Sequence, residues 1–391
     1  MSMNSGRTLF SQVMDTVPMH EFHRCVERYK GEYKVQNFSC WNHFLCMAFA
    51  QLTYRESLRD IVHCLNAQPS KLYHLGFRSA ITRSTLSYAN NTRSWRIYAD
   101  LAGMLMKTAK TLYRNEPFAL DLDSAVYALD STTIDLCLSM FPWAHFRQHK
   151  AAVKIHTLFD VRDKIPSILA ISSGKLHDVN ALDLLMTEPG AVYIFDKAYI
   201  DFARLHQFTL SGAYFVTRAK SNMHFSRLYS HHVDKYSGLR SDQTIQLSGF
   251  YTSRDYPDTL RRITYYHAQT QKSFVFITNN FLLPSLTVAQ LYQCRWQVEL
   301  FFRWIKQHLR IKAFYGTSVN AVKTQIWIAL SVYLIVAIIK KQLKLEHSLY
   351  TILQILSVSL FEKVPISQAL TDTQHRFEQH QVDNQLNLFN L

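Results

Sequence analysis

Residues 292–306, YQCRWQVELFFRWIK, form the most informative stretch of the chain. A helix turns about 100° per residue, so it would gather the polar side chains of this stretch on a strip about 60° wide. The strip contains Tyr292, Arg295, Glu299 and Lys306, and it continues into Arg303 and Arg310. The remaining helical surface is largely apolar, which is typical of a buried helix. A single acid on such a helix is costly unless a partner or a ligand neutralises it.

The simplest partners for Glu299 are Arg295 and Arg303, which each lie one helical turn away. An ion pair within the helix would explain all three residues without any further function. The acidic residues that end two predicted strands earlier in the chain favour a functional interpretation instead.

The composition indicates a cytoplasmic protein that binds a polyanion. The 391 residues carry a net charge of +14, and residues 204–312 hold 15 Lys and Arg against 5 Asp and Glu, a surplus of +10. Six cysteines without a CxxC pair indicate reduced thiols, and residues 1–20 lack a signal-peptide pattern. The longest apolar run, Ile326–Ile339, is typical of a buried helix and is short for a membrane span.

Residues 1–115 are expected to form a helical domain that binds DNA. Apolar residues recur every three to four positions in Phe10–Tyr29, Trp41–Gln51, Ser57–Leu65 and Thr92–Arg114. The segment Ile81–Trp95, ITRSTLSYANNTRSW, is rich in side chains that contact bases and phosphates, and we expect DNA contacts from Arg83, Asn90 and Arg93. A capped loop between two helices is the structural alternative for the same segment.

The chain changes character near Pro117, where alternating and β-branched residues begin. The pattern predicts a mixed α/β sheet from strands at Ala125–Asp130, Thr133–Leu138, Val153–Val161, Ser167–Lys175, Ala191–Asp196 and Tyr214–Lys220, with helices near Asn180–Met186 and Phe202–Ser211. Short β segments separated by turn residues make 221–284 a small, basic, β-rich insertion. Buried helices follow in 285–345, the last at Val319–Leu345, and 346–391 is predicted to be a helix with a polar tail.

Two acidic residues, Asp130 and Asp196, each end an apolar strand, VYALD and VYIFD. Functional groups of open α/β sheets gather at the carboxyl ends of strands, although a single Asp there is commonly a turn residue. Together with Glu299, the pair provides three carboxylates, which can hold two divalent cations about 4 Å apart and promote phosphoryl transfer. Mg²⁺ suits oxygen ligands, and the cations of the helix suit phosphates: Arg295, Arg303 and Lys306.

The sequence resembles the DDE transposases of bacterial insertion sequences, in the insertion-sequence-four group. The signature of that group is a Tyr, an Arg three positions on, a Glu four further and a Lys seven further, and it is complete as Tyr292, Arg295, Glu299 and Lys306. ALDSTTIDL around Asp130 and FDKAYIDF around Asp196 are similar to the motifs of the first two acids, and GKLHDVNALD at Gly174–Asp183 also resembles the family. Lys197 and Ala198 stand where the family more often has Arg and Gly. The resemblance covers roughly residues 8–345.

The resemblance implies an RNase H-like catalytic domain, a mixed sheet flanked by helices, in residues 116–220 and 285–345. In this domain Asp130, Asp196 and Glu299 would be catalytic and would hold two Mg²⁺ or Mn²⁺ ions per active site. Contacts to the phosphates of the transposon ends are implied for Tyr292, Arg295 and Lys306, and Lys197 keeps a basic residue beside the second acid. The implied partners are the double-stranded DNA of the inverted repeats and of the target, with a homodimer in the DNA complex, at the bacterial nucleoid and without a membrane.

Members of this group often use a DNA hairpin, with a tryptophan of the insertion holding a flipped base. Residues 197–291 contain no tryptophan, so an aromatic ring such as Phe250, Tyr251 or Tyr266 would have to stack in its place. Asp121, Asp123 and Asp135 are expected to be surface or turn acids. For His156 and His177 we expect a hydrogen-bonded structural role, with metal ligation as the alternative. Two alternatives share the predicted fold: an RNase H-like nuclease without strand transfer, and a DNA-binding protein that has lost catalysis.

Overall fold

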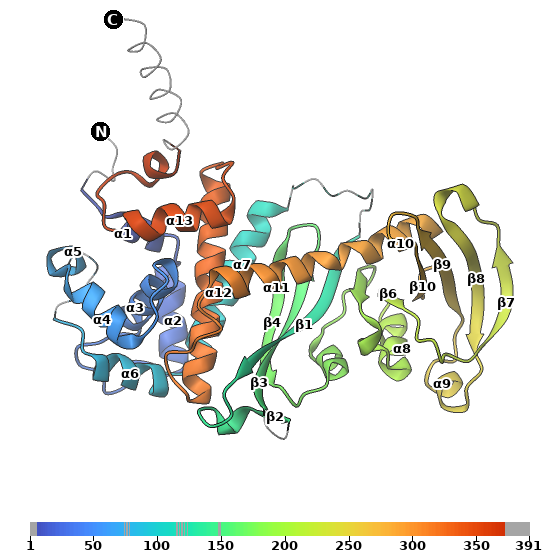
Figure 1. Ribbon diagram of the computed structural model, residues 1–391, viewed down its shortest axis with the longest axis horizontal. Coiled ribbons are helices and arrows are strands. Elements are labelled where there is room, and N and C mark those ends of the chain that lie inside the picture. Colours follow the sequence, from blue (N-terminus) through green and yellow to red (C-terminus); the bar gives the residue numbers. More distant parts are fainter. Residues whose placement is uncertain are drawn as a thin grey trace, which may run out of the picture. The chain divides into compact units, whose positions relative to one another are not determined.

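The computed structural model describes residues 6–371, apart from positions 74, 76, 78, 115, 117, 119, 121, 123, 148 and 149. The chain divides into two compact units, one made of residues 1–113 with 304–391 and the other of residues 114–303 (Figure 1). The first unit is helical and the second contains the sheet, so the predicted fold class is confirmed. Asp121, Asp123 and the end of the polar tail, from residue 372, lie outside the described residues.

The helical unit is assembled from both ends of the chain. Pro18 lies at the N-cap of α2, so the single helix predicted over Phe10–Tyr29 is two helices, because proline cannot continue a preceding helix. The segment Ile81–Trp95 contains a helix that was not predicted, α6, capped by Thr82, whose side chain accepts from the amide of Thr85. The helices of this unit are α1 (Leu9–Met14), α2 (Met19–Arg28), α3 (Cys40–Leu52), α4 (Leu58–Asn66), α5 (Pro69–Tyr73), α6 (Arg83–Thr92), α7 (Arg96–Tyr113), α12 (Val319–Gln342) and α13 (Leu349–Ser359).

The core of the helical unit is α12, which packs against α3, α6, α7 and α13. Every residue from Ile326 to Ile339 is buried, which confirms the buried helix predicted from the apolar run. By length and composition, α12 could cross a membrane, but 94% of the qualifying window is buried inside the unit. An apolar helix that is covered by other helices is explained by its role as a core element.

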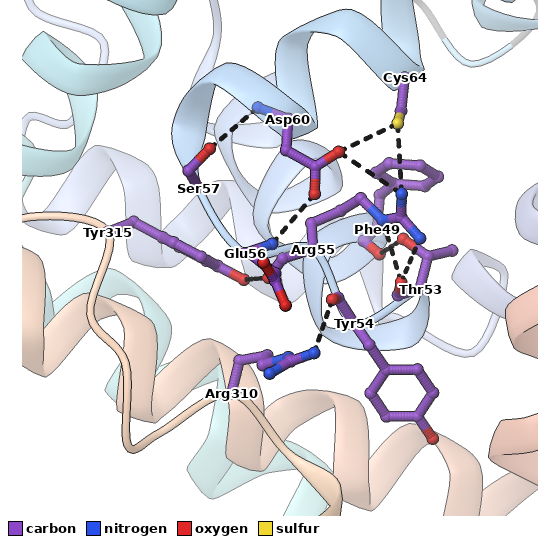
Figure 2. A network of polar contacts seen from close by, with 10 residues as sticks. All are labelled: Phe49, Thr53, Tyr54, Arg55, Glu56, Ser57, Asp60, Cys64, Arg310 and Tyr315. Carbon is purple, nitrogen blue, oxygen red and sulfur yellow. Dashed lines mark hydrogen bonds and ion pairs between the residues drawn. The ribbon is translucent and has the colours of Figure 1, made fainter.

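Figure 2 shows how the turn between α3 and α4 is held. Arg310 donates from Nη2 to the carbonyl of Tyr54 at 2.9 Å, and the hydroxyl of Tyr315 donates to the carbonyl of Arg55 at 2.6 Å. The guanidinium of Arg55 in turn lies 3.5 Å from Asp60. Tyr54 has a φ of 55°, a left-handed conformation that non-glycine residues rarely adopt without such fixation. Arg310, predicted on the cationic strip, therefore has a structural role here.

The described part of the second unit forms a ten-stranded mixed sheet in the order β2-β3-β1-β5-β6-β10-β9-β8-β7, with β4 paired to β3. The pairs β1–β5 and β5–β6 are parallel, and the other pairs are antiparallel. The strands are β1 (Val126–Leu136), β2 (His145–Arg147), β3 (Lys150–Asp160), β4 (Ile165–Ser173), β5 (Val192–Phe195), β6 (Tyr214–Arg218), β7 (Phe225–His231), β8 (Leu239–Leu247), β9 (Leu260–His267) and β10 (Lys272–Thr278).

Two features of this sheet differ from the prediction. The strands predicted at Ala125–Asp130 and Thr133–Leu138 are the single strand β1. The two residues between them are a serine and a β-branched threonine, and no Gly or Pro forms a turn there. The helix predicted near Asn180–Met186 is a short 3-10 helix at Asp178–Leu184. The β-rich insertion continues the same sheet, since β10 pairs with β6 and the remaining insertion strands follow it (Figure 1).

Helices α8 (Phe202–Leu210), α9 (Phe250–Asp255), α10 (Ser285–Cys294) and the first part of α11 (Trp296–His308) complete this unit. The stretch predicted as one helix is divided between α10 and α11 at Arg295, which keeps right-handed helical torsion angles. The i, i+4 spacing across the junction is therefore preserved. One face of α11 is buried through Val298, Phe301 and Phe302, and Phe301 packs against Phe159 of β3 at a ring distance of 5.5 Å.

Candidate active site

Asp130 and Asp196 lie at equivalent positions on neighbouring parallel strands. Leu129 of β1 pairs in register with Phe195 of β5, and each is followed directly by one of the two acids. The strand β5 ends there, whereas β1 continues to Leu136 with β3 as its partner, so Asp130 marks the end of the parallel pairing and not the end of its strand. The two carboxylates are thus brought to the same edge by the register of two strands.

Each aspartate is held by a backbone amide directly after it. Asp130 accepts from the amide of Ser131 at 2.8 Å, and Asp196 accepts from the amide of Lys197 at 2.6 Å, as the N-cap of a short 3-10 helix. Such local bonds fix the first side-chain torsion angle and orient the remaining oxygen. The second oxygen of Asp130 is used by a residue far along the chain.

Arg295 connects Asp130 to Glu299. Its Nη1 lies 3.0 Å from Oδ2 of Asp130 and its Nη2 lies 2.6 Å from Oε1 of Glu299. The side chains are only 14%, 19% and 30% exposed for Arg295, Asp130 and Glu299, so the bridge is shielded from bulk water. Glu299 is also the only acidic residue between Asp258 and Glu346 in the sequence. The ion pair predicted between Arg295 and Glu299 is present, and it includes the strand acid.

The surroundings of Asp130 change its pKa. Burial raises the pKa of Asp130 to about 6, and the negative charges of Glu299 and Asp196 act in the same direction. The amide of Ser131 and the guanidinium of Arg295 oppose the increase. The charges of Glu299 and Asp196 therefore both act on the carboxyl group of Asp130.

Three carboxylates of this kind suit hard divalent cations, which prefer oxygen ligands. Among the residues that the structure describes, no three His, Cys, Asp or Glu side chains form a closed ligand set, and Arg295 lies between two of the three acids. Burial, followed by the charges of Glu299 and Asp196, raises the pKa of Asp130 more than the amide of Ser131 and the guanidinium of Arg295 lower it. The donor chemistry of the three acids fits divalent cations.

Comparison with known proteins places this site in a family. Residues 121–335, more than half of the chain and all three acids, match the family model of the transposase DDE domain. The chain belongs to the DDE transposases. Residues 5–78 of the transposase also match a domain of unknown function, which supports an insertion-sequence-four-like family. The predicted recognition, function and enzyme class are confirmed, and the family implies a DNA substrate and a dependence on divalent metal ions.

The transposase is similar to proteins of three bacteria. A transposase of Sinorhizobium fredii, y4zB, is 30% identical over 72% of this chain and 78% of its own length. A transposase for insertion sequence element IS5377 of Geobacillus stearothermophilus is 29% identical over 55% of this chain and 57% of its own length. A transposase for insertion sequence element IS4SA of Synechocystis is 23% identical over 66% of this chain and 71% of its own length.

The other predicted phosphate contacts of the transposase differ in exposure. Arg303 and Lys197 are exposed, and the guanidinium of Arg303 lies 5.9 Å from the ring centroid of Trp296. Tyr292 is half-buried beneath Arg295, with its ring 4.9 Å from that of Phe276. Lys306 is half-buried on the part of α11 that belongs to the helical unit.

Of the three DNA contacts predicted in the N-terminal region, only Arg83 is exposed. Asn90 and Arg93 are 1% and 7% exposed. The guanidinium of Arg93 donates to the carbonyls of Phe38 and Ser39, the latter at 2.6 Å, and lies 5.1 Å from the ring centroid of Phe38. Asn90 is buried, and the side chain of Arg93 binds the segment just before α3, so we leave both out of the proposed DNA surface.

Sequence reasoning missed a polar chain that adjoins Asp130. The hydroxyl of Ser131 donates to Asp178 at 2.5 Å, and Lys154 donates to the same Oδ1 at 3.0 Å. Burial raises the pKa of Asp178, but the hydrogen bonds from Ser131 and Lys154 lower it by more. The pKa therefore lies below its ordinary value, and the carboxylate stays ionised. The family-like segment Gly174–Asp183 contained the signal, although its partners on β1 and β3 could not be assigned from spacing alone.

Predicted structural roles are also found for two side chains. His156 is 3% exposed and contacts the hydroxyl of Ser172 through Nε2 at 2.8 Å, and burial lowers its pKa. Asp135 is exposed on β1 beyond the parallel pairing. Two of the possible stacking residues, Phe250 and Tyr251, are 81% and 66% exposed and line a cavity of about 490 Å³ together with Lys220 and His224.

Proposed function

We propose that this transposase binds the terminal inverted repeats of its insertion sequence as a homodimer and excises the element in a cut-and-paste reaction. Hydrolysis at each end frees a 3′-OH, the second strand is cut as well, and the 3′-OH then attacks a phosphodiester of the target DNA and displaces its 3′-oxygen. The observation that carries the proposal is the convergence of three acids: the β1–β5 register brings Asp130 beside Asp196, and Arg295 ties Asp130 to Glu299. Contacts between segments far apart in sequence bring these three acids together, and a shared chemical role explains this arrangement better than packing does.

In this proposal Asp130, Asp196 and Glu299 would hold two Mg²⁺ or Mn²⁺ ions per active site. Bound ions of this kind lower the pKa of the attacking water and stabilise the leaving oxygen of a phosphodiester. The protein orients the three acids through the amides of Ser131 and Lys197 and through the α11 helix. Carboxylates that are fixed in this way need little reorganisation before reaction.

The residues predicted to contact phosphates would position the DNA backbone. Arg303 and Lys197 are exposed and free to contact phosphates, and Tyr292 and Lys306 are accessible in part. Arg295 is engaged with two acids, so its contact with a phosphate would require that one of these bonds be exchanged. A guanidinium can make this exchange because carboxylate and phosphate oxygens accept the same fork of donors.

Different parts of the chain would carry out end recognition, catalysis and the holding of DNA. Residues 1–115 would recognise the transposon ends, residues 116–220 with 285–345 would carry the chemistry, and residues 221–284 would hold DNA near the cut. The strongly basic balance of the chain supports a polyanionic partner. In this proposal the reaction takes place at the nucleoid, without a membrane. Residues 346–391 have no assigned role in the reaction.

The test is a cleavage and strand-transfer assay on DNA that carries the inverted repeats flanking the encoding element, with Mg²⁺ or Mn²⁺. Wild-type protein should give cut and joined products, and Asp196→Asn should give neither. Asp135→Asn, which removes an exposed acid from β1, is the matched control and should behave like wild type. Cutting without joining would support a nuclease, and binding without any metal-dependent cut would support a non-catalytic DNA-binding protein.

A further inference from the structure

Two cations of the helical unit lie against one tryptophan ring. The guanidinium of Arg96, at the start of α7, lies 4.7 Å from the ring centroid of Trp95, and Nζ of Lys323 on α12 lies 4.6 Å from it. Arg96 is exposed, and Trp95 and Lys323 are partly exposed. We refer to these three residues as the Trp95 cluster. Although each cation–π contact is favourable, two like charges beside one ring repel each other.

The one acidic residue close to the Trp95 cluster along these helices is Asp100, one turn after Arg96 on α7, and its carboxylate is bound by Arg28 and Tyr29. Residues 61–99 and residues 300–345, which supply α6, the start of α7 and α12, contain no Asp or Glu. Within the described part of the chain, no carboxylate forms an ion pair with Arg96 or Lys323. Burial lowers the pKa of Lys323, and the charge of Arg96 lowers it further. The cluster thus keeps a net positive charge at a cost that an anionic ligand would remove.

The position of the Trp95 cluster is fixed by Asn320. Nδ2 of Asn320 donates to the carbonyls of Asn90 and Arg93 at 3.0 and 2.6 Å, and Oδ1 of Asn320 accepts from the amide of Trp95 at 3.2 Å. Lys323 follows Asn320 by one helical turn. Trp95 also stacks on the buried ring of Trp327, with an angle of 4° between the planes. The two cations are therefore presented by a rigid platform, which lowers the entropy lost on binding.

The surface beside the cluster is also suited to DNA. The exposed face of α6 carries hydroxyl, amide and guanidinium groups, and its described exposed residues are Arg83, Ser84, Thr85, Tyr88, Asn91 and Thr92. Side chains of these types make most contacts to the DNA backbone. Because α6 ends at Thr92, three residues before Trp95, an extended polyanion bound at the Trp95 cluster would also reach the end of this helix, whereas a small anion would use only the two cations.

We propose that Trp95, Arg96 and Lys323 form a binding site for the phosphate backbone of double-stranded DNA, on the helical unit and separate from the three acids. The proposal deepens the proposed function, on which it rests for the identity of the polyanion. The two cations contact phosphates, and the tryptophan ring holds their stems in place. Contacts of this kind add affinity without base specificity.

The experiment measures the binding of a fluorescently labelled duplex by anisotropy, in EDTA and at several salt concentrations. Arg96→Gln and Lys323→Gln keep part of each stem against Trp95 but remove the charge. Each should weaken binding about 3- to 10-fold and lower the slope of log K against log salt by about one, and the double variant should lower the slope by about two. Arg96→Lys and Lys323→Arg keep the positive charge, so each should retain most of the wild-type slope.

Lys107→Ala is the matched control, because Lys107 is exposed on the same helix, about 16 Å along its axis from Arg96. It should change affinity and slope much less than the cluster variants. If Arg96→Gln and Lys323→Gln bind DNA as Lys107→Ala does, the site is wrong. A wild-type protein that binds the duplex without salt dependence would instead overturn the proposed function.

Thermal unfolding separates a binding role from a structural one. Because the two charges repel each other, each Gln variant should unfold at the wild-type temperature or slightly above it. A marked fall in the unfolding temperature of both variants, with an unchanged salt slope, would mean that the cations serve packing and would overturn the proposal.

Discussion

Arg295 donates from Nη1 to Oδ2 of Asp130 at 3.0 Å, although 165 residues separate the two in sequence. The same guanidinium holds Glu299 through its other terminal nitrogen at 2.6 Å. A single cation therefore joins the acid on β1 to the acid on α11. The transposase assembles its proposed site from a strand register and one charged bridge.

The first prediction concerns this bridge. Arg295→Ala removes two charge-assisted hydrogen bonds and leaves two poorly solvated carboxylates close together, so it should lower the free energy of unfolding by about 2 kcal/mol. Urea denaturation at pH 7.5 measures the change. Arg303→Ala removes an exposed arginine of the same helix and should change the stability by less than about 0.5 kcal/mol. Equal stabilities of the two variants would show that the bridge contributes nothing.

The second prediction separates catalysis from binding at Glu299. Glu299→Gln keeps the size of the side chain and can still accept a hydrogen bond from Arg295, but it removes the charge that a divalent ion requires. Cleavage of transposon-end DNA should fall by at least about a thousandfold in this variant. Its duplex affinity in EDTA should stay within about threefold of wild type.

Normal cleavage by Glu299→Gln would remove this residue from the proposed triad. Loss of both cleavage and duplex binding would point instead to a fold defect, which circular dichroism would detect. The Asp135→Asn variant should keep both activities.

The third prediction uses a buried ion pair of the β-rich insertion. Asp242 and Arg261 are 2% and 8% exposed and lie 2.6 Å apart, and the hydroxyl of Ser285, the first residue of α10, donates to the same carboxylate at 2.6 Å. Asp242→Asn would leave the charge of Arg261 buried without its partner and should cost about 3–5 kcal/mol of stability. The pair supports the start of the helix that leads to Arg295.

The pH dependence of this pair follows from the pKa of Asp242. Burial raises that pKa, but the hydrogen bonds from Arg261 and Ser285 outweigh burial and lower it below its ordinary value. The stabilisation is therefore present above the pKa of the unfolded chain, about 4, and is lost as the pH falls through the lower folded value. The stability difference between wild type and Asp242→Asn should be constant from pH 7.5 to 5 and should narrow below about pH 4. A difference that widens toward acid pH would contradict this assignment.

The proposed acids could be predicted from the sequence because each has a local signature. Asp130 and Asp196 follow apolar strand patterns, and Glu299 stands four positions after Arg295 on a helical strip. The structure adds what no local pattern contains, such as the bond between Arg295 and Asp130. The link from Ser131 to Asp178 depends in the same way on contacts between segments far apart in the chain. Whether a side chain is buried also depends on contacts between distant segments.

Arg93 illustrates the limit most directly, since its sequence neighbourhood is typical of a DNA-binding segment but its side chain is buried. It is also the subject of the fourth prediction. Arg93→Ala removes two hydrogen bonds to the carbonyls of Phe38 and Ser39 and the cation–π contact with Phe38, so it should lower the free energy of unfolding by about 2–3 kcal/mol.

Duplex binding distinguishes Arg93 from the exposed Arg83 near the other end of the same segment. Under conditions in which the variants are fully folded, Arg93→Ala should keep the wild-type salt slope because its guanidinium does not reach solvent. Arg83→Ala should lower the slope by about one and leave the stability within about 0.5 kcal/mol of wild type. Anisotropy titrations and urea denaturation of both variants measure the two effects. A lower salt slope for folded Arg93→Ala would return this arginine to the DNA surface, since only a phosphate contact changes the number of counterions released.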